Sequence, residues 1–399
     1  MHITAIIAEY NPFHNGHLYQ LSKIKKDLES NYVVSIISGN FTQRGLPTII
    51  DKFHRTRMAL ASGIDMVIEL PTIYATASAE FFARGAISIL DKCNIVSALC
   101  FGAESPDLQI FKQISELLLD EPSGYKTHLN NLLKSGYSYP SARSHAICKH
   151  FNNPSLEHFI SSPNNILGIE YLKALQYYFS PILPISIQRE ITNYKDKTIY
   201  SNLASASAIR KALEINEIEQ LANAMPKECL QILLEHKYPD INKLYDLVCY
   251  KLMTGPKSEI YSTFDVPANL INSIYNSLGQ VTTYRMLAEK LTSKTYSKAT
   301  VYRSLLKIIL GIYPDKYDGD YVRVLGIRES SKNLLSLLYK QSRIPVITNA
   351  KAATSSRFSD KQLNSLNTDI LATNLYSILN GDNSLYNADF NKKFIIYPS

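Results

Sequence analysis

The sequence predicts an α/β fold: a Rossmann-like parallel sheet followed by a mainly α-helical C-terminal domain. Over the first hundred residues, short apolar runs alternate with amphipathic stretches, which is the pattern of βαβ units. Beyond about residue 215 strand-like runs almost disappear, and leucine-rich stretches with helical spacing replace them. The 399 residues, 45% of them hydrophobic, suffice for two or three domains with their own cores.

The N-terminal elements follow one another at short intervals. Strands are predicted over residues 3–8, 32–38, 65–70 and 95–101, and helices over residues 17–28, 51–62 and 78–90. In an open parallel sheet, ligands bind outside the carboxyl ends of the strands. The segments that follow Ala8, Ser38, Leu70 and Phe101 are therefore the expected location of a site.

The later elements define two predicted domains. Residues 1–215 form the first, with a helical insertion at about 105–160, a helix that starts at Ser162-Pro163, a fifth strand over 182–187 and a helix over 205–213. Residues 216–399 form the second, which is expected to be helical and basic. Its predicted helices cover residues 244–252, 270–278, 286–291, 300–310 and 332–338.

The positive charge of the chain lies in one region. The formal net charge is +7, and between Arg285 and Lys351 thirteen Lys and Arg residues stand against five Asp and Glu residues. The excess therefore belongs to this C-terminal stretch. It fits a phosphate-rich partner such as a nucleic acid, although a solvated basic face is the alternative.

Other classes of protein lack support in the sequence. No apolar run near the N-terminus approaches the roughly 20 residues of a membrane span, and no export signal is present, so we expect no membrane association. Five scattered cysteines without C-x-x-C spacing favour a reducing cytoplasm over a disulfide or zinc framework. The chain has neither an H-E-x-x-H metal motif nor a P-loop, and no protein metal ligand is predicted.

The most specific motif lies directly after the first strand. His14 and His17 flank Asn15-Gly16 at the start of a helix, so both imidazoles face the same way. The helix N-terminus offers N–H groups to phosphate oxygens, and Gly16 permits the close approach of a nucleotide. Imidazole N–H groups stabilise the charge that develops when a phosphoanhydride breaks. We therefore predict a nucleotide site here, with two capping histidines as the alternative.

Other polar residues follow the later strands. Gly102 permits a purine or ribose to lie against the backbone, or is a simple turn glycine. Asn164, with Asn165 as the second choice, suits the edge of adenine, although an Asn near a helix start also caps it. Arg189 is placed to stack on the base or to bind an oxygen, or is a solvated surface residue.

Two further segments carry candidate polar groups. Ser207 and Arg210, near the start of a helix, are suited to hold the β- and γ-phosphates and to stabilise departing pyrophosphate; a plain helix cap with an exposed Arg is the alternative. Asn40, Gln43 and Arg44 follow the second strand. They either bind a small substrate or order their own loop.

The basic stretch mixes cations with tyrosines, which suits phosphate contact together with base stacking. Tyr296 and Tyr302 have helical spacing and are better core candidates than stacking residues. The cations carry the prediction of RNA contact: Lys294, Lys298, Arg303 and Lys307, extended by Arg323, Arg328, Lys332, Lys340 and Arg343.

Several blocks together resemble one family. His14 to His17 match the H-x-G-H signature of nucleotidyltransferases and class I aminoacyl-tRNA synthetase-like domains. The longer segments are similar to the bacterial tRNA(Met) cytidine acetate ligase family. They are Glu9-Tyr-Asn-Pro-Phe-His-Asn-Gly-His17, Ser38-Gly-Asn-Phe-Thr-Gln-Arg-Gly45, Phe101-Gly-Ala-Glu104, Ser162-Pro-Asn-Asn-Ile-Leu-Gly-Ile-Glu-Tyr171, Ser205-Ala-Ser-Ala-Ile-Arg210 and Tyr321-Val-Arg-Val-Leu-Gly326.

The resemblance implies a reaction and a set of residues. It implies activation of acetate by ATP to acetyladenylate, with release of pyrophosphate, and acetylation of the exocyclic amine of the wobble cytidine in elongator tRNA(Met). It assigns catalysis to His14, His17 and Arg210. With these substrates, the loop of Asn40, Gln43 and Arg44 is expected to bind acetate or the cytidine, or only to order itself. It assigns ATP binding to residues of the first motif and of the later blocks: Ile7, Ala8, Glu9, Tyr10, Asn11, Pro12, Phe13, Asn15, Gly16, Leu18, Tyr19, Gln20, Gly102, Asn164, Arg189 and Ser207.

Some expectations remain open at this level. Mg²⁺ is expected to bridge the phosphates of ATP, as triphosphate chemistry usually requires. The chain lacks the double-lysine loop of the synthetases, so Arg210 or Lys211 must supply that charge. Two other functions are a small-molecule adenylyltransferase of cofactor metabolism and a non-catalytic RNA-binding protein with a relict nucleotide fold. Retention of both histidines and Gly16 argues against the second.

Overall fold

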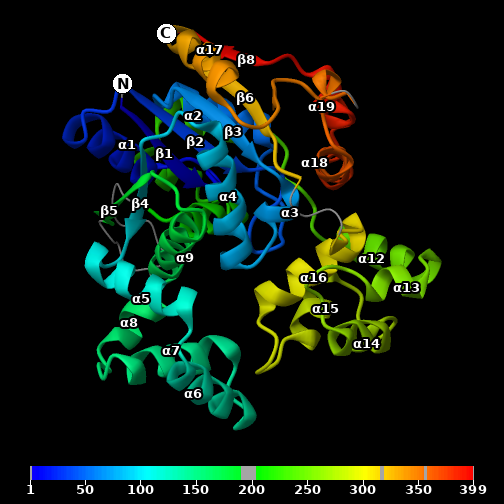
Figure 1. Ribbon diagram of the computed structural model, residues 1–399. Coiled ribbons are helices and arrows are strands. Elements are labelled where there is room, and N and C mark those ends of the chain that lie inside the picture. Colours follow the sequence, from blue (N-terminus) through cyan, green and yellow to red (C-terminus); the bar gives the residue numbers. More distant parts are fainter. Residues whose placement is uncertain (1, 190–203, 315–318, 355–356, 399) are drawn as a thin grey trace.

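The computed structural model describes residues 2–189, 204–314, 319–354 and 357–398 (Figure 1). One eight-stranded sheet forms its centre, in the order β5-β4-β1-β2-β3-β6-β7, and β8 pairs with β6. The strands are β1 (Ile3–Ala8), β2 (Tyr32–Ser38), β3 (Met66–Leu70), β4 (Ala98–Ala103), β5 (Leu183–Gln188), β6 (Val322–Arg328), β7 (Val346–Ile347) and β8 (Ile395–Tyr397). The predicted α/β class is confirmed.

The first five strands are parallel, because a helical crossover connects each of them to the next of the five. Their register aligns Ala8 with Ile37 and Ser38 with Leu70, while Gly102 pairs with Ile187 on the other side of β1. The carboxyl ends of β1 to β4 therefore meet at one edge. The sequence places these five strands within three residues of their observed ends.

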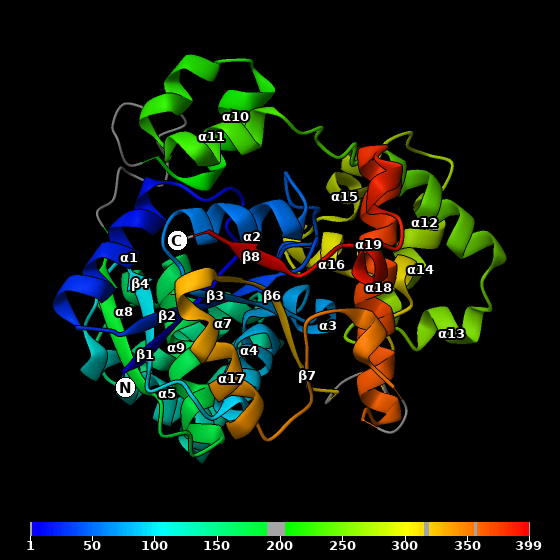
Figure 2. The same ribbon diagram turned by 90° about the horizontal axis from the view of Figure 1, so that it is seen from above.

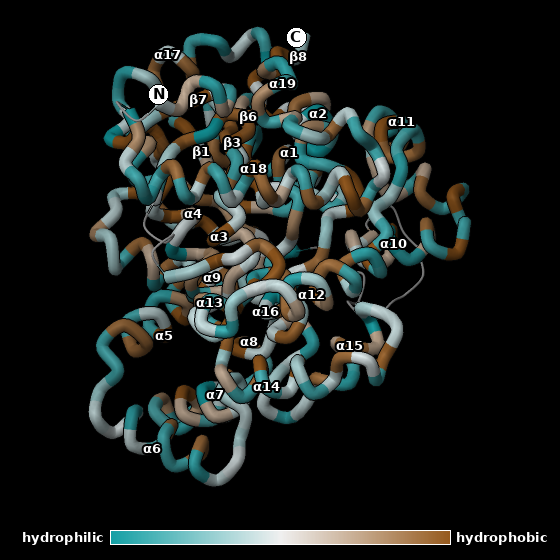
Figure 3. The backbone as a smooth tube through the Cα atoms, turned by 90° about the vertical axis from the view of Figure 1, so that its right-hand side faces the viewer, coloured by the Kyte–Doolittle hydropathy of each residue, from teal (hydrophilic) through white to brown (hydrophobic). Residues whose placement is uncertain are grey.

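Helices cover both faces of the sheet and bury its apolar strands, which are the brown segments in the centre of Figure 3. These flanking helices are α1 (Asn15–Asp27), α2 (Lys52–Ala61), α3 (Thr72–Ala75), α4 (Ala79–Cys93), α9 (Pro163–Tyr177) and α17 (Lys332–Gln341). At the N-terminus of α2, the Asp51 carboxylate accepts hydrogen bonds from the backbone N–H groups of Phe53 and His54. This cap fixes where the chain turns from the sheet edge into the helix.

Two helical bodies extend from the sheet layer (Figure 1). The first occupies the predicted insertion and contains α5 (Leu108–Asp120), α6 (Ser123–Lys134), α7 (Tyr139–His150) and α8 (Leu156–Ser161). The second contains α12 (Lys243–Thr254), α13 (Lys257–Tyr261), α14 (Ala268–Ser277), α15 (Tyr284–Leu291) and α16 (Lys298–Leu310). No helix within the described ranges is long and apolar enough to cross a membrane.

The remaining helices connect these bodies to the sheet. They are α10 (Ala206–Glu214) and α11 (Lys227–Leu234), joined by a 3₁₀ helix (Ile218–Asn223), then α18 (Asp360–Asn380) and α19 (Ala388–Asn391). Figure 2 shows α10 and α11 together at one side of the molecule, next to α1 and α2. Asn15 donates hydrogen bonds to the carbonyl oxygens of Asn223 and Ala224, so this linker is held against the start of α1.

The expectation of almost no strand after residue 215 is wrong. Strand β6 pairs antiparallel with β3 and extends the sheet, and β7 and β8 flank it. The apolar run of β6 is interrupted by Arg323, which lowers its strand-like appearance, and β7 and β8 have only two and three residues. The C-terminal part is thus mainly helical, but it completes the sheet of the N-terminal part.

Candidate active site

The two histidines lie where β1 turns into α1. His14 is the N-cap of α1, with extended backbone, and its Nδ1 accepts a hydrogen bond from the Gly16 N–H at 3.1 Å. The Nδ1 of His17 accepts the His14 N–H at 3.2 Å, and the two rings stack with centroids 3.8 Å apart. Because both Nδ1 atoms accept hydrogen bonds, both rings carry their proton on Nε2 when neutral.

The surroundings keep both rings neutral. Burial, with the nearby charges of Arg189 and Arg210, lowers the pKa of His14 from 6.5 to about 3. Burial, together with His14 and Arg189, lowers the pKa of His17 well below 6.5. A Cβ on Gly16 would lie 2.9 Å from Cε1 of His14, so glycine leaves room for the ring. The site therefore presents two neutral Nε2–H donors beside two guanidinium groups.

Three residues before His14 pack against the histidine motif or hold its loop through hydrogen bonds. Tyr10 and Phe13 are buried, and their rings lie 4.8 Å and 5.3 Å from the His17 ring. Tyr10 adopts a positive φ of 46°, and its hydroxyl accepts a hydrogen bond from Ser35 at 3.1 Å. Asn11 is also buried, and its Oδ1 accepts the Ile49 N–H at 2.8 Å. These residues are predicted ATP contacts, but their side chains hold the loop in place.

The other predicted motif residues lie at the sheet edge or along α1. Pro12 is buried, Leu18 is exposed, and Ile7, Ala8, Asn15 and Tyr19 are half-buried. Gln20 donates to the carbonyl oxygen of Cys100 at 3.2 Å, which ties α1 to β4. The candidate catalytic groups of this segment are therefore the helix N-terminus and the two imidazoles.

A second group lies at the ends of β4 and β5. Arg189 passes over Gly102, where a Cβ would lie 3.0 Å from the arginine Cγ, and donates to Oδ1 of Asn164 at 2.8 Å. The Nδ2 of Asn164 donates to Oε1 of Glu104 at 2.6 Å. This chain of contacts joins three predicted residues in one network, and it includes Glu104, which the sequence analysis did not single out.

Asn165 has a structural role. It is fully buried, and its Oδ1 accepts the Glu104 N–H at 3.0 Å, while its own N–H donates to Glu104 Oε2 at 3.1 Å. Asn164 is half-buried and directly contacts Arg189, so of the two it is the better candidate for a nucleotide contact. Glu104 directly follows strand β4 in the Phe101–Glu104 block. Its position after a strand could have identified it as a candidate site residue.

Helix α10 brings Arg210 to the histidine loop. Its Nη1 donates to the carbonyl oxygen of Asn11 at 2.6 Å, and its charge lowers the pKa of His14. Ser205 is the N-cap of this helix, and its Oγ lies 2.9 Å from that of Ser207. Ser207 is exposed in the first turn of α10. The predicted pair therefore lies beside the first motif, with Ser205 as an additional hydroxyl.

The loop after β2 contacts the first motif through its backbone. The Gln43 N–H donates to Oε1 of Glu9 at 2.9 Å, and Arg44 is exposed. Asn40 is buried with an exposed fraction of 2%, and its Oδ1 accepts the Lys52 N–H at 2.8 Å. Its Nδ2 and the buried Oγ of Ser38 have no hydrogen-bond partner among the described residues. Buried donors in this state indicate a place for an external polar group.

Arg55 holds the ends of two strands together, and the sequence analysis missed it. Its Nη1 donates to the carbonyl oxygens of Glu9 at 2.6 Å and Ser38 at 3.0 Å, and its Nη2 donates to that of Gly39. Burial lowers the pKa of Arg55 to about 10, so it stays charged at neutral pH. An arginine inside an amphipathic helix is normally exposed, and only the fold places this one inside.

A buried ion network lies next to this loop. Lys52 contacts Glu69 at 2.6 Å and Asp389 at 2.8 Å, and Arg323 contacts the same two carboxylates at 3.1 Å and 2.7 Å. Two cations and two anions balance, which makes their burial tolerable. Arg323 therefore does not extend the basic surface, contrary to the expectation, because its guanidinium is in the core.

The predicted RNA-contacting lysines and arginine fall into three groups. Lys294 and Lys298 are exposed, and Lys298 forms an ion pair with Glu289 at 2.8 Å. Arg303 is half-buried and donates to the carbonyl oxygen of Gln43 at 3.4 Å, so it holds the loop after β2. Lys307 is buried and forms an ion pair with Asp265 at 3.0 Å. Its prediction as an RNA contact is wrong, because its ammonium does not reach the surface.

The outer part of the basic stretch is mixed. Lys332, Lys340 and Arg343 are exposed and Arg328 is half-buried. Lys332 pairs with Glu329 at 2.7 Å and Arg343 with Asp91 at 2.6 Å, which neutralises part of the charge. Tyr302 is buried and stacks on Tyr284 with centroids 5.4 Å apart, as expected for a core residue.

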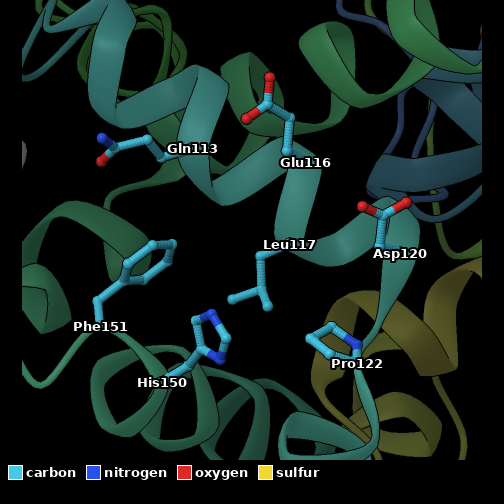
Figure 4. Close-up of a pocket in the computed structure, with 7 residues that line it drawn as sticks. All are labelled: Gln113, Glu116, Leu117, Asp120, Pro122, His150 and Phe151. Carbon is cyan, nitrogen blue, oxygen red and sulfur yellow. The ribbon is translucent and has the colours of Figure 1, made fainter.

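A cavity of about 320 Å³ in the helical insertion is a poor phosphate site (Figure 4). It lies between α5 and α7, and its lining includes the carboxylates of Glu116 and Asp120 but no Lys or Arg. Two carboxylates repel a phosphate group. The candidate active site is therefore the sheet edge with the histidines and Arg189, and not this cavity.

Comparisons with known proteins place this geometry in context. A family model described as HIGH Nucleotidyl Transferase matches residues 1–391. A relative from Clostridium perfringens (strain SM101 / Type A), named tRNA(Met) cytidine acetate ligase, is 39% identical over 393 residues, which cover 95% of this chain and 96% of the relative. A relative of the same name from Thermoanaerobacter sp. (strain X514) is 38% identical over 98% of both chains.

Two solved structures have the same architecture. The ligand-free crystal structure of Thermotoga maritima TmcAL matches with a TM-score of 0.93 and 28% sequence identity, and each chain is covered completely. The same protein bound with alpha-thio ATP matches with a TM-score of 0.90, again over both complete chains. The structural similarity therefore covers both the sheet with the candidate site and the helical bodies.

Proposed function

The chain belongs to the HIGH nucleotidyl transferases and, among them, to the tRNA(Met) cytidine acetate ligases, and from this we propose that it is an ATP-dependent RNA-acetylating ligase. It activates acetate as acetyladenylate and releases pyrophosphate. The exocyclic amine of the wobble cytidine of elongator tRNA(Met) then attacks the acetyl carbon. The bond between that carbon and the AMP phosphate oxygen breaks, AMP leaves, and the nitrogen loses a proton to give N4-acetylcytidine. The observation that carries this proposal is the pair of neutral Nε2–H histidines beside Arg189 and Arg210.

The first step is attack on the α-phosphorus of ATP. An acetate oxygen forms the new P–O bond, and the bond to the pyrophosphate oxygen breaks. Negative charge increases on the non-bridging oxygens during this exchange, where the Nε2–H groups of His14 and His17 and the N-terminus of α1 donate. Neutral donors suit this task because they need no proton transfer at the phosphorus. These two residues are the proposed catalytic histidines.

The remaining contacts divide between the base and the phosphates. Gly102, Asn164 and Arg189 form a continuous surface at the ends of β4 and β5, which we assign to the nucleoside. Ser207, in the first turn of α10, and Arg210 are assigned to the pyrophosphate that leaves. Asn11 binds Arg210 through its carbonyl oxygen and so fixes the guanidinium relative to the histidines.

Acetate is assigned to the loop after β2. The Nδ2 of Asn40 and the Oγ of Ser38 are buried donors without a described partner, at the strand end next to the histidine motif. A carboxylate is the simplest acceptor for two such donors.

Magnesium is assigned to the phosphate oxygens of ATP alone. Among the described residues no three His, Cys, Asp or Glu side chains converge as a metal site. Exposed Lys294 and Lys298, on the helical body, are the proposed RNA contacts. We propose the cytoplasm as the compartment of the enzyme; the tRNA substrate and the five free cysteines support this.

The proposal is tested by incubation of the protein with ATP, ¹⁴C-acetate and bacterial total tRNA, followed by digestion to nucleosides. We expect label in N4-acetylcytidine, and pyrophosphate exchange into ATP that requires acetate. The second candidate, a small-molecule adenylyltransferase, predicts exchange driven by a mononucleotide or by phosphopantetheine, with no label in tRNA. Absence of acetate-dependent exchange in a folded protein would refute the ligase assignment.

A further inference from the structure

A small basic cavity lies outside the assigned site, between α2 and the segment that connects α19 to β8. Its volume is about 280 Å³, and it is lined by Phe53, His54, Arg57, Lys392, Lys393 and Ile395. Figure 2 shows β8 running alongside α2, which brings the two lining segments together although 339 residues separate His54 from Lys393 in the sequence. Three of the six lining residues carry a permanent positive charge.

These three cations differ from Lys52, the buried cation at the start of helix α2. Arg57, Lys392 and Lys393 form no ion pair among the described residues, whereas the nearby Lys52 has two carboxylate partners. The closest anionic group is engaged: Oδ1 of Asp51 accepts the Phe53 N–H at 2.8 Å, and its Oδ2 lies 2.5 Å from Nδ1 of His54. Lys392 also lowers the pKa of Asp51 and Asp382, without contacting either carboxylate.

Ring contacts fix the positions of two side chains that line the cavity. The Lys392 Nζ lies 4.9 Å from the centre of the Phe53 ring, a cation–π contact that holds the ammonium toward the cavity. The His54 ring packs on His236 with centroids 3.6 Å apart. The three positive charges that line this cavity repel one another. An anion with several acceptor oxygens would reduce this repulsion, so the arrangement favours such an anion as the ligand.

The cavity is one helix away from the candidate active site. In the same helix, Arg55 binds the carbonyl oxygens of Glu9 and Ser38 at the ends of β1 and β2. His54 and Arg57, three residues apart, share the outer side of α2, while Arg55 points inward. The cavity and the strand ends lie on opposite sides of α2. Because a helix with its side chains is roughly 10 Å across, the two are separated by about that distance.

We propose that this cavity binds a backbone phosphate of the RNA strand whose nucleotide enters the active site. The inference rests on the proposed function, since it names where the tRNA substrate is held. A phosphodiester brings an acceptor to the three cations and leaves the strand free to continue over the exposed Arg57 and Lys393. The cavity thus anchors RNA close to the chemistry, whereas Lys294 and Lys298 bind it on the helical body.

The test uses the full-length protein and elongator tRNA(Met) transcript. The triple variant Arg57→Gln/Lys392→Gln/Lys393→Gln is compared with Lys26→Gln/Lys134→Gln/Lys361→Gln, which removes three exposed charges from α1, α6 and α18. Dissociation constants are measured over a range of salt concentrations. Acetate-dependent pyrophosphate exchange, without RNA, shows that each variant is folded and active.

We expect the cavity variant to bind tRNA about tenfold or more weakly and to lose about two from the slope of log K against log salt, with unchanged exchange. The control variant should change both quantities much less. The charge-preserving variant Arg57→Lys/Lys392→Arg/Lys393→Arg should retain most of the affinity. Lys393→Glu alone, at an exposed position, should already weaken binding if the triple variant fails to fold.

Three outcomes overturn the inference in different ways. If the wild-type protein binds tRNA and the cavity variant matches the control, the cavity does not bind RNA and the proposed function stands. If the wild-type protein has no affinity for tRNA, the proposed function fails and the inference fails with it. Equal displacement of the bound tRNA by poly-glutamate of the same charge would also overturn it, since the cavity would then accept acidic peptides.

Discussion

Arg189 extends over Gly102 and donates a hydrogen bond from Nη1 to Oδ1 of Asn164 at 2.8 Å. The two partners come from the end of β5 and the first turn of α9, and Gly102 lies near the end of β4 between them. A side chain at position 102 would take the space that the arginine stem occupies. The surface formed by Gly102, Asn164 and Arg189, which we propose for the nucleoside, therefore requires a residue without Cβ at position 102.

Gly102→Ala should weaken ATP binding without unfolding the protein. The new Cβ would lie 3.0 Å from Cγ and 3.4 Å from Cδ of Arg189, so the arginine must move and its contact with Asn164 must lengthen. Loss of one hydrogen bond to a charged group predicts an increase of KM for ATP by about tenfold. Gly124→Ala is the control, because a Cβ there meets nothing within 4 Å. An unchanged KM in Gly102→Ala would contradict the assignment.

The buried histidines should make the protein less stable in acid. The unfolded chain takes up protons below pH 6.5, whereas folded His14 stays neutral down to about pH 3. The free energy of unfolding therefore falls as the pH falls from about 6.5 towards 3, by up to about 1.4 kcal/mol per pH unit for this group. His14→Asn keeps a good N-cap and should show a shallower decline in urea titrations. A decline as steep as that of the wild-type protein would count against the neutral ring.

Asn40 should control the use of acetate. Asn40→Ala removes the free Nδ2 donor, and we expect KM for acetate to rise by about tenfold or more while KM for ATP changes little. Asn40→Asp keeps the acceptor for the Lys52 N–H but places a negative charge against the substrate, so it should be worse than alanine. The rate of pyrophosphate exchange, measured at varied acetate and at varied ATP, gives the two KM values for each variant. A rise of KM for ATP alone would contradict the assignment of acetate to this loop.

The exposed lysines of the helical body should affect RNA alone. Lys294→Gln/Lys298→Gln should weaken tRNA binding and lower the salt slope by about one per lost phosphate contact, with acetate-dependent exchange intact. Lys307→Met is the control for either single variant, Lys294→Gln or Lys298→Gln: it also removes one positive charge, but from a buried position, and should leave tRNA affinity unchanged. If Lys307→Met lowers tRNA affinity as much as a single exposed variant does, net charge rather than contact explains the loss.

Arg303 should behave as a positioning residue of the active site. Its Nη1 donates to the carbonyl oxygen of Gln43, and a Cβ on Gly45 would lie 2.4 Å from its backbone nitrogen, so this loop packs directly on α16. Arg303→Ala should lower kcat of acetate-dependent exchange more than it changes tRNA affinity, and Arg303→Lys should restore part of it. Loss of tRNA affinity with normal exchange would instead support a direct RNA contact.

The sequence predicts the first five strands because they are apolar on both faces and end at Gly, Pro or polar residues. It also predicts the histidine site, because His14, Gly16 and His17 follow a strand directly. These signals are local. Arg55 and Glu104 were missed because their roles depend on contacts with groups that are remote in the chain. Lys307 was misassigned because a charge gives no sign of burial until its partner, Asp265, is brought near.

The same limitation explains strand β6. Its arginine looks like a surface residue until Glu69 and Asp389 surround it. Periodicity describes one segment at a time, so it does not show that a late segment completes the edge of an early sheet.

The pairing of β6 with β3 has a consequence for how this enzyme can be divided. A fragment that ends near residue 215 would leave an open edge at β3 and would bury Lys52 and Glu69 without Arg323 and Asp389. We therefore expect that residues 1–215 alone would not fold as a stable unit. The segment with the histidine motif and the C-terminal strand β6 depend on one shared sheet and one shared ion network.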